Sequence, residues 1–430
     1  MNILYIKRAY NTRLHTQIQA LSERGHSIIL LLEAPLEYGY NGPGQWDVRE
    51  IRSRFPVIYA SLGNARAQRP HGTGLIVKVL NRMKGMEQSL SFGRLGSLKD
   101  RQYLKTLDQV LSKYRVDLVL SGNDALPDED HRTRLILDRF GGKVPIVYDC
   151  QDILSDCFIG NRHVEESERA VHEKADGVIH TNPLALKWAA IRYRLKRGYA
   201  FSNYSNRKYF PNRGPKLSSR DGRIHLVYCG GVQRTPKGYG HPFARDMKKR
   251  FMEIASLGHP LHLHLGLYPG SAIRDYYMEL EKSPNIRIHP YRSFSEMMQA
   301  LSLYDVGLFP LDLSSLNDQI EARGLQVLDQ SRFSRIDTSK QYEYTLAGLS
   351  MLTAPVRWVS DWLRENHFGT SFHSIEDLGN LLRSKEMSGY LDSVRQAASR
   401  FSIEHQIGGL ERFLVDLSGK CVGGDGGEGR

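Results

Sequence analysis

Short apolar runs alternate regularly with helix-like segments along this sequence. The run "NILYIK" near the amino terminus is typical of a buried strand, the segment His15–Arg24 of a helix that ends at Gly25, and "HSIILLL" of a second strand. Strands connected in this way by helices form parallel sheets with right-handed crossovers. Further strands of this series are predicted at Val116–Gly122, Val144–Cys150 and Asp176–Asn182.

A second series of strands starts after a change of composition. Residues Asn203–Arg223 are polar, basic and rich in Pro, Gly and Ser, which is typical of a linker. Strand-like runs then recur at helix-sized intervals, at Arg223–Gly231, Leu261–Leu267, Asn285–Tyr291, Asp305–Leu311 and Leu349–Pro355. We therefore predict an α/β protein with two Rossmann-like, doubly wound domains that face a central cleft, the usual place for a ligand in such folds.

The length of the chain agrees with two domains. Its 430 residues are too many for one ordinary core and enough for two α/β domains. We expect an amino-terminal domain over residues 1–205 and a carboxy-terminal domain over 206–390. The helical periodicity near the end predicts helices in 391–418 that pack back towards the first domain. Residues 419–430 have nothing to bury and are expected to be disordered.

Charge and cysteine content restrict the partners and the compartment. The net charge of +12 indicates an anionic partner, such as a phosphorylated substrate, an anionic lipid or a nucleic acid. No helix-turn-helix, zinc-finger or RNP pattern accompanies the charge, so we expect no nucleic-acid partner. The four cysteines fit neither a disulfide framework nor a zinc motif, which favours reduced thiols in a cytoplasm. Because the chain opens directly on a strand, we also expect no secretion signal.

Residues 74–105 mix apolar side chains with several Lys and Arg residues. One interpretation is a basic amphipathic helix on an anionic membrane surface, which would place the protein at the inner face of the cell membrane. The other is a pair of ordinary surface helices whose apolar faces pack on the sheet. The sequence leaves both open.

Lys340 and Glu343 stand about one turn apart at the start of a predicted helix that ends at Gly348. A glutamate suits the positive end of a helix, but a lysine does so only where it and the helix end face the same anion. A diphosphate would explain the lysine, and a ribose would explain the carboxylate. The alternative is an ordinary ion pair on a solvated helix start.

Gly230 and Gly231 end a predicted strand and precede Arg234 and Lys237. Glycines at such a turn let backbone N–H groups approach an anion closely. Many strand-to-helix turns carry glycine for geometry alone, so this pair by itself leaves the anion site open.

The stretches "DVGLFPL" and "SKQYEYTLAGLSMLTAP" together resemble the nucleotide-sugar signature of GT-B glycosyltransferases, of the family 4 or group 1 branch. The resemblance implies a GT-B fold and a nucleotide-diphosphate sugar as donor. On the matching positions it implies the following contacts: Lys340 with the diphosphate, Glu343 with the ribose, Gly230 and Gly231 in the phosphate loop, Arg234 or Lys237 as a nearby cation, and Tyr291 near the base.

Two positions depart from the family pattern. Arg335 stands where many relatives carry a glutamate that contacts the donor sugar, and Gln151 stands where they carry a histidine after a strand ending in "VYD". With no histidine there, Asp149 and Asp152 are the candidates for the catalytic base. Both carboxylates have an alternative role as caps of the next helix.

The sequence and the resemblance together predict a hexosyltransferase-like glycosyltransferase that needs neither a metal nor a cofactor. Lys340, a basic residue after Gly231 and the helix dipoles would neutralise the leaving diphosphate. A UDP-sugar is the favoured donor, and the acceptor is a glycan, a lipid-linked molecule or another small molecule, as in polysaccharide biosynthesis. Two alternatives remain: a GT-B epimerase or hydrolase of nucleotide sugars, and a catalytically silent protein that binds glycans or lipids.

Overall fold

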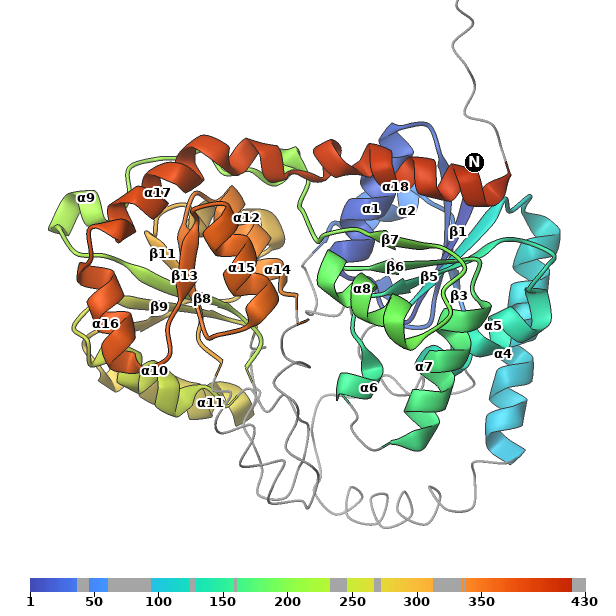
Figure 1. The fold of residues 1–430 in the computed structure, drawn as a ribbon, viewed down its shortest axis with the longest axis horizontal. Helices are drawn as coiled ribbons and strands as arrows, with labels where there is room; N and C mark the ends of the chain where they lie inside the picture. The colour runs from blue at the N-terminus through green and yellow to red at the C-terminus, as the bar shows by residue number, and fades with distance from the viewer. Residues whose placement is uncertain are drawn as a thin grey trace, which may run out of the picture.

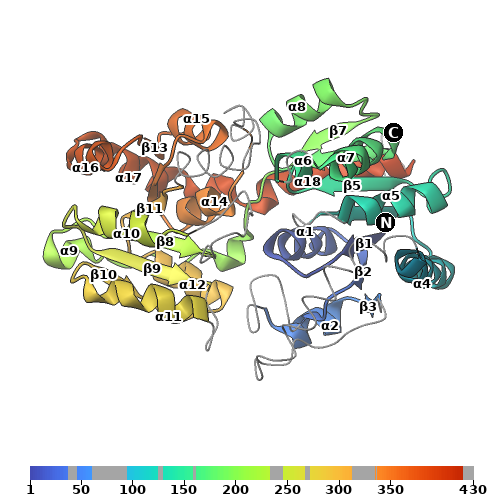
Figure 2. The same ribbon diagram turned by 90° about the horizontal axis from the view of Figure 1, so that it is seen from below.

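The computed structural model describes residues 1–36, 46–60, 94–123, 129–157, 161–232, 246–266, 272–311, 335 and 337–419. These residues form two α/β domains that lie side by side, each built on one sheet (Figure 1). Helices lie on both sides of each sheet, as the view from below shows (Figure 2).

The amino-terminal domain contains a seven-stranded sheet in the order β3-β2-β1-β4-β5-β6-β7. Its strands are β1 (Asn2–Lys7), β2 (Ser27–Leu32), β3 (Val57–Tyr59), β4 (Leu118–Gly122), β5 (Ile146–Cys150), β6 (Gly177–His180) and β7 (Gly198–Ala200). Every neighbouring pair is parallel. The order reverses between β1 and β4, which is the doubly wound arrangement that the sequence predicts.

The helices of this domain follow from local signals. They are α1 (Thr12–Glu23), α2 (Val48–Arg54), α4 (Arg94–Lys113), α5 (Glu129–Phe140), α6 (Leu154–Cys157), α7 (Arg162–Lys174) and α8 (Pro183–Arg192). The Asn11 side chain caps α1 by accepting a hydrogen bond from the Leu14 backbone N–H (2.8 Å). The φ of Gly25, +83°, is the left-handed conformation that ends a helix, so this predicted helix stop is confirmed.

The carboxy-terminal domain repeats the arrangement in six strands, ordered β10-β9-β8-β11-β12-β13. The strands are β8 (Leu226–Gly230), β9 (Leu261–Leu265), β10 (Ile286–Ile288), β11 (Val306–Phe309), β12 (Ser350–Thr353) and β13 (Gly369–Ser371). Its helices are α9 (Ser218–Asp221), α10 (Lys248–Ala255), α11 (Ala272–Met278), α12 (Phe294–Leu301), α14 (Ser339–Leu346), α15 (Arg357–Glu365), α16 (Ile375–Arg383) and α17 (Glu386–Ala397). The two sheets therefore share one doubly wound strand order.

The sequence did not predict β3, β7 and β13. Each contains only three residues, and each joins the end of its sheet. A run this short carries too little hydrophobic periodicity to be recognised, because the strand signal needs about four to eight residues.

The last helix, α18 (Ile403–Ser418), crosses back to the amino-terminal domain (red in Figure 1). It packs on α1, where Leu410 and Leu414 are fully buried. Glu411 accepts hydrogen bonds from Arg24 (2.5 Å) and His26 (2.8 Å) at the edge of this contact. This helix therefore ties the end of the chain to its beginning.

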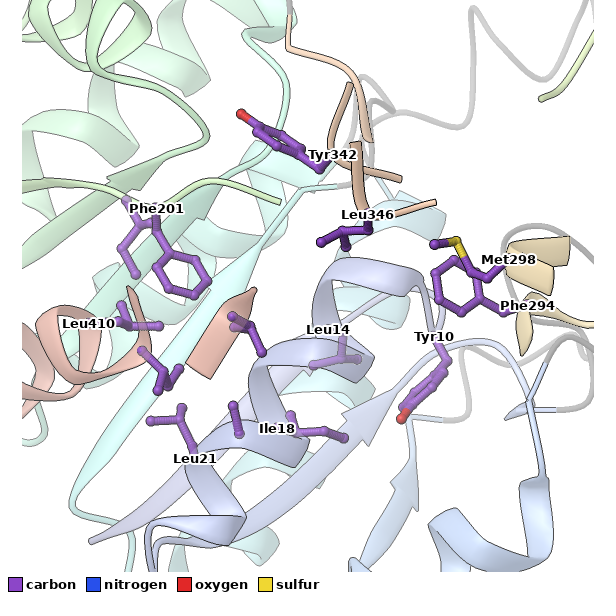
Figure 3. Close-up of a cluster of buried hydrophobic side chains, with 14 of the residues drawn as sticks. Tyr10, Leu14, Ile18, Leu21, Phe201, Phe294, Met298, Tyr342, Leu346 and Leu410 are labelled. Atoms are coloured by element: carbon purple, nitrogen blue, oxygen red, sulfur yellow. The ribbon is translucent and has the colours of Figure 1, made fainter. Parts of the chain in front are cut away.

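One hydrophobic cluster includes side chains of both domains (Figure 3). Leu14 and Ile18 of α1 belong to it, and so do Phe294 of α12 and Leu346 of α14. Trp46 of the amino-terminal domain packs on Phe294 of α12, with ring centres 5.4 Å apart, and Tyr10 packs on Trp46 (6.2 Å). Separating the domains would expose this apolar surface to water, so the cluster holds them together.

No helix in the described parts of the chain is both long and apolar enough to cross a bilayer. Of the segment 74–105, only the part from Arg94 onward, in α4, is described. Tyr103 and Leu107 of this helix are buried in the core of the amino-terminal domain. For this part, the structure favours an ordinary helix packed on the sheet, and the remainder lies outside the described residues.

Candidate functional site

The candidate site lies where the strand order reverses, because the carboxyl ends of the central strands leave a crevice there. In the carboxy-terminal domain this point falls between β8 and β11. β8 ends at Gly230, β11 ends at Phe309, and α14 packs against β11 and β12.

Lys340, at the start of α14, reaches the glycine turn at the end of β8. A Cβ atom on Gly230 would lie 2.7 Å from both Cε and Nζ of Lys340, and the φ of Gly230, +154°, is one that other residues rarely adopt. The Lys340 ammonium lies 5.6 Å from the ring centre of Tyr228 and 5.5 Å from that of Phe309. The structure therefore brings together the lysine and the glycine turn that the sequence singled out separately.

Glu343 lies one helical turn beyond Lys340 on α14. Lys340 is only 8% exposed and Glu343 is half-buried. Burial raises the pKa of Glu343, and the positive charge of Lys340 opposes this rise. The burial of both side chains contradicts the alternative of an ordinary ion pair on a solvated helix start.

Cys229 belongs to the same group of side chains. Burial raises the pKa of its thiol to about 12, Glu343 acts in the same direction, and Lys340 acts against it. The thiol is therefore uncharged at neutral pH, and Lys340 supplies the positive charge next to the glycine turn.

The other predicted donor contacts are less closely placed. Gly231 is exposed, and its carbonyl accepts a hydrogen bond from the Tyr228 hydroxyl (2.9 Å). Tyr291 is half-buried in the segment between β10 and α12, at the same sheet edge but two strands away from β8. Arg234 and Lys237 lie outside the described residues.

Asp149, at the end of β5, has no exposed surface. It accepts hydrogen bonds from Arg13 Nη2 (2.6 Å) and Nε (3.0 Å), and from Gln17 (3.3 Å). Burial acts to raise the pKa of Asp149, but the charges of Arg13 and Lys7 outweigh it and hold the pKa below its usual value. Asp149 is therefore a fully buried carboxylate paired with Arg13, with no surface open to solvent.

Asp152 is exposed, in the loop that follows β5. The Asn123 side chain holds the backbone of this loop: its Oδ1 accepts hydrogen bonds from Gln151 N–H (3.0 Å) and Asp152 N–H (3.1 Å), and its Nδ2 donates to the Asp152 carbonyl (2.8 Å). Gln151 Oε1 accepts a further hydrogen bond from Asn11 (3.2 Å). Of the two predicted carboxylates, Asp152 is therefore the one whose position permits contact with an acceptor.

Arg335 joins the two domains. Its guanidinium lies 2.7 Å from the Asp156 carboxylate and 4.3 Å from the ring centre of Trp188, both in the amino-terminal domain. Its backbone carbonyl accepts a hydrogen bond from Asn182 (3.0 Å). The arginine that departs from the family pattern thus makes interdomain contacts, and no local sequence signal could have named partners so distant in the chain.

Asp337, which the sequence analysis did not single out, lies three residues before Lys340. Its carboxylate accepts hydrogen bonds from Tyr342 (3.1 Å), Trp358 (3.3 Å) and Asn203 (3.4 Å). Burial raises the pKa of Asp337 to about 7, against the opposing effects of Tyr342, Arg13 and Trp358. A carboxyl group that titrates near neutral pH, three residues before Lys340, is a candidate for proton transfer.

A cavity of about 480 Å³ opens elsewhere on the carboxy-terminal domain. Its lining includes Arg213, Lys216, Gly348 and Arg395. Gly348 immediately precedes Leu349 and β12, so this basic cavity lies at the amino ends of the strands. Ligands of doubly wound folds bind at the opposite edge, so the cavity is separate from the candidate site.

No protein-family model and no curated protein matches this chain in sequence. Solved structures match it over nearly its whole length. Sucrose-phosphate synthase (tll1590) from Thermosynechococcus elongatus has a TM-score of 0.59 at 13% identity, over 97% of this chain and 99% of that one. Anabaena Alr3699/HepE in complex with UDP has a TM-score of 0.60 at 14% identity, over 97% and 100%. A putative UDP-N-acetylglucosamine 2-epimerase from Listeria monocytogenes has a TM-score of 0.56 at 12% identity, over 98% and 97%.

Identities this low establish the fold alone, and the topology agrees with it. Both sheets are parallel, both have the doubly wound order, and the last helix returns to the first domain. The chain therefore has the GT-B fold that the sequence predicts, with two Rossmann-like domains.

Proposed function

We propose that the protein is a glycosyltransferase that takes a sugar from a nucleotide-diphosphate donor, with UDP favoured as the nucleotide. The observation that carries the proposal is the contact between the Lys340 ammonium and the Gly230 turn, with Glu343 one turn further along α14. A cation, a glycine turn and a helix start are groups that bind anions, and this supports a diphosphate as the ligand.

The chemistry follows from the charge that develops on the leaving diphosphate. Lys340 and the positive end of α14 would stabilise this charge electrostatically, so the proposal requires no metal ion and no cofactor. Glu343 would accept hydrogen bonds from the ribose hydroxyls. Tyr291 would lie towards the base, with Arg234 or Lys237 as a further cation beside Gly231.

The comparisons support this choice of donor. Structures of Anabaena Alr3699/HepE are complexes with UDP and with UDP-glucose. Both match nearly the whole of this chain, with TM-scores of 0.60 and 0.58. Because the fold is shared, the carboxyl edge of the sheet in the carboxy-terminal domain would be available for a nucleotide in this chain as well.

On the acceptor side we propose that Asp152 takes the acceptor proton and that Asp149 holds the end of β5 in place. The acceptor would be a glycan, a lipid-linked molecule or another small molecule, bound by the amino-terminal domain. We further propose a cytoplasmic protein that works at the inner face of the cell membrane when its acceptor is anchored there.

A nucleotide-sugar epimerase is the second candidate. It is favoured by the match to the putative epimerase from Listeria monocytogenes. Incubation with the donor alone distinguishes these enzymes from a transferase. An epimerase or hydrolase forms an epimer or free sugar without an acceptor. A transferase consumes the donor only when an acceptor is added.

A ligand screen tests the proposal. The protein is melted with UDP, GDP and ADP and with their sugars, because a ligand that binds only the folded state raises the melting temperature. We expect UDP and a UDP-sugar to give the largest shift, and Lys340→Ala to abolish it. If none of these nucleotides shifts the melting temperature or binds in calorimetry, the proposed function is wrong, and a protein that binds glycans or lipids without catalysis takes its place.

A further inference from the structure

Three buried side chains with metal-binding atoms lie close together next to the loop that follows β5. This loop contains Gln151 and Asp152 and is called the acceptor-side loop below. Cys150 is the last residue of β5, His180 is the last residue of β6, and His172 lies on α7. Their ligand atoms all lie within 4.8 Å of one another. Each side chain is at most 1% exposed. Cys150 and His180 are register partners on neighbouring parallel strands, so their side chains lie on the same face of the sheet.

The geometry of the two histidines suits a shared ion. His172 Nδ1 lies 2.7 Å from the Glu168 carbonyl oxygen and donates its proton to it, which leaves the lone pair on His172 Nε2. That atom lies 3.2 Å from His180 Nε2. Two imidazole nitrogens bound tetrahedrally to one zinc ion lie about 3.3 Å apart, given Zn–N distances of about 2.0–2.1 Å. A backbone carbonyl on the far nitrogen is also the usual second contact of a metal-bound histidine.

A buried carboxylate, that of Glu168, lies beside the cluster. Glu168 is fully buried, and its described partners are uncharged donors: Ser155 N–H (2.8 Å), the Ser155 hydroxyl (2.9 Å) and the Tyr193 hydroxyl (2.5 Å). Its charge acts on Cys150. A nearby cation lowers the cost of burying a carboxylate. A divalent ion held by one thiolate would leave one positive charge beside Glu168.

We propose that Cys150, His172 and His180 bind one zinc ion, which fastens the ends of β5 and β6 to α7. One thiolate and two imidazoles are a ligand set that suits zinc, and water would complete the tetrahedron. When the ion binds, the Cys150 thiol loses its proton to the solvent, and the sulfur forms the bond to zinc. The cysteine spacing gave no sign of this site, because its ligands are far apart in sequence and are joined by strand pairing.

The ion would support the catalytic side of the molecule without taking part in the reaction. Asp149 precedes Cys150, and Gln151 and Asp152 follow it in the acceptor-side loop. Two residues after His180, Asn182 donates a hydrogen bond to the Arg335 carbonyl (3.0 Å) in the other domain. Zinc at this position would therefore stiffen both the loop and one interdomain contact.

The test measures metal content in the full-length protein. We expect about one zinc ion per chain by mass spectrometry of the protein purified from zinc-containing medium. Cys150→Ala and His180→Gln should each lose it. The matched control is His262→Gln. His262 Nε2 lies 2.9 Å from His225 Nδ1, so these two residues are a similar buried histidine pair, but they belong to no cluster with a cysteine among the described residues. This variant should retain zinc.

A second measurement uses only the wild-type chain, in case the variants fail to fold. Zinc is removed with a chelator and cobalt(II) is added, and we expect the near-ultraviolet absorption of a thiolate–cobalt bond together with a recovered melting temperature. A wild-type protein that holds neither zinc nor cobalt contains a hydrogen-bonded histidine pair only, and the proposal is then wrong. Stoichiometric copper in place of zinc would likewise overturn it.

Discussion

The side chain of Lys340 fills the space that any side chain at Gly230 would need. A Cβ atom there would lie 2.7 Å from Lys340 Nζ, closer than real contacts allow. The two residues belong to different elements of the carboxy-terminal domain, the start of α14 and the end of β8. A side chain at Gly230 would therefore push the flexible end of Lys340 away from the turn.

Gly230→Ala should therefore abolish binding of the nucleotide donor, because the new methyl group displaces the ammonium. The matched control is Gly258→Ala, since Gly258 also has a positive φ (+85°) but open space around its Cβ position. Both variants should lose about 1 kcal/mol or more of stability from backbone strain. Calorimetry with UDP should show lost binding for the first variant only, and equal binding by both would contradict the contact.

Lys340→Ala and Glu343→Ala should each lower donor turnover about 100-fold or more, which is the usual cost of removing one group that stabilises a transition state. The control is Lys216→Met. Lys216 is also buried, but it donates hydrogen bonds to the Tyr304 and Gly348 carbonyls at the other edge of the sheet. That variant should be less stable and still bind UDP when folded. Wild-type kinetics in both site variants would refute the assignment of the donor site.

Asp149 and Asp152 should respond differently to the same change. Asp149→Asn breaks a buried ion pair with Arg13, which should cost about 3–5 kcal/mol of unfolding free energy. Asp152→Asn alters an exposed side chain, so the melting temperature should stay the same while turnover falls about 100-fold or more. Denaturant unfolding and steady-state kinetics of both variants check this. Unchanged turnover in Asp152→Asn would remove it as the catalytic base.

Asp337 should make the stability of the protein depend on pH. Its folded pKa of about 7 lies above the value for an unfolded chain. The folded state therefore binds a proton that the unfolded state releases, and this contribution to stability is present below about pH 4 and lost as the pH rises through about 7. In Asp337→Asn this loss should be absent. Unfolding free energies measured from pH 5 to pH 8 should fall more steeply in the wild type, and equal slopes would contradict the raised pKa.

Much of the proposed donor site could be picked out from the sequence because its signals are local. The glycine turn follows its strand directly, and Lys340 and Glu343 stand one turn apart in a segment with a recognisable helix end. The sequence singled out Lys340 and the glycine turn separately, and their proximity required only that both lie at the carboxyl edge of one parallel sheet. Strand–helix alternation already determines that edge.

The acceptor side was harder to predict, because its roles depend on partners distant in sequence. Asp149 lies within the buried strand β5 and Asp152 in the loop after it, but only the position of Arg13 on α1 shows that Asp149 is paired. The interdomain role of Arg335 depends in the same way on Asp156.

Local sequence signals specify the two strand series, the helix ends at glycine, and the residues at the carboxyl edge of the second sheet. These depend on periodicity and turn chemistry within a few residues. The tertiary structure decided which carboxylate is buried, which arginine joins the domains, and that Cys150 lies beside His180 and His172. Those outcomes depend on strand order and domain packing, which bring together side chains that no local pattern connects.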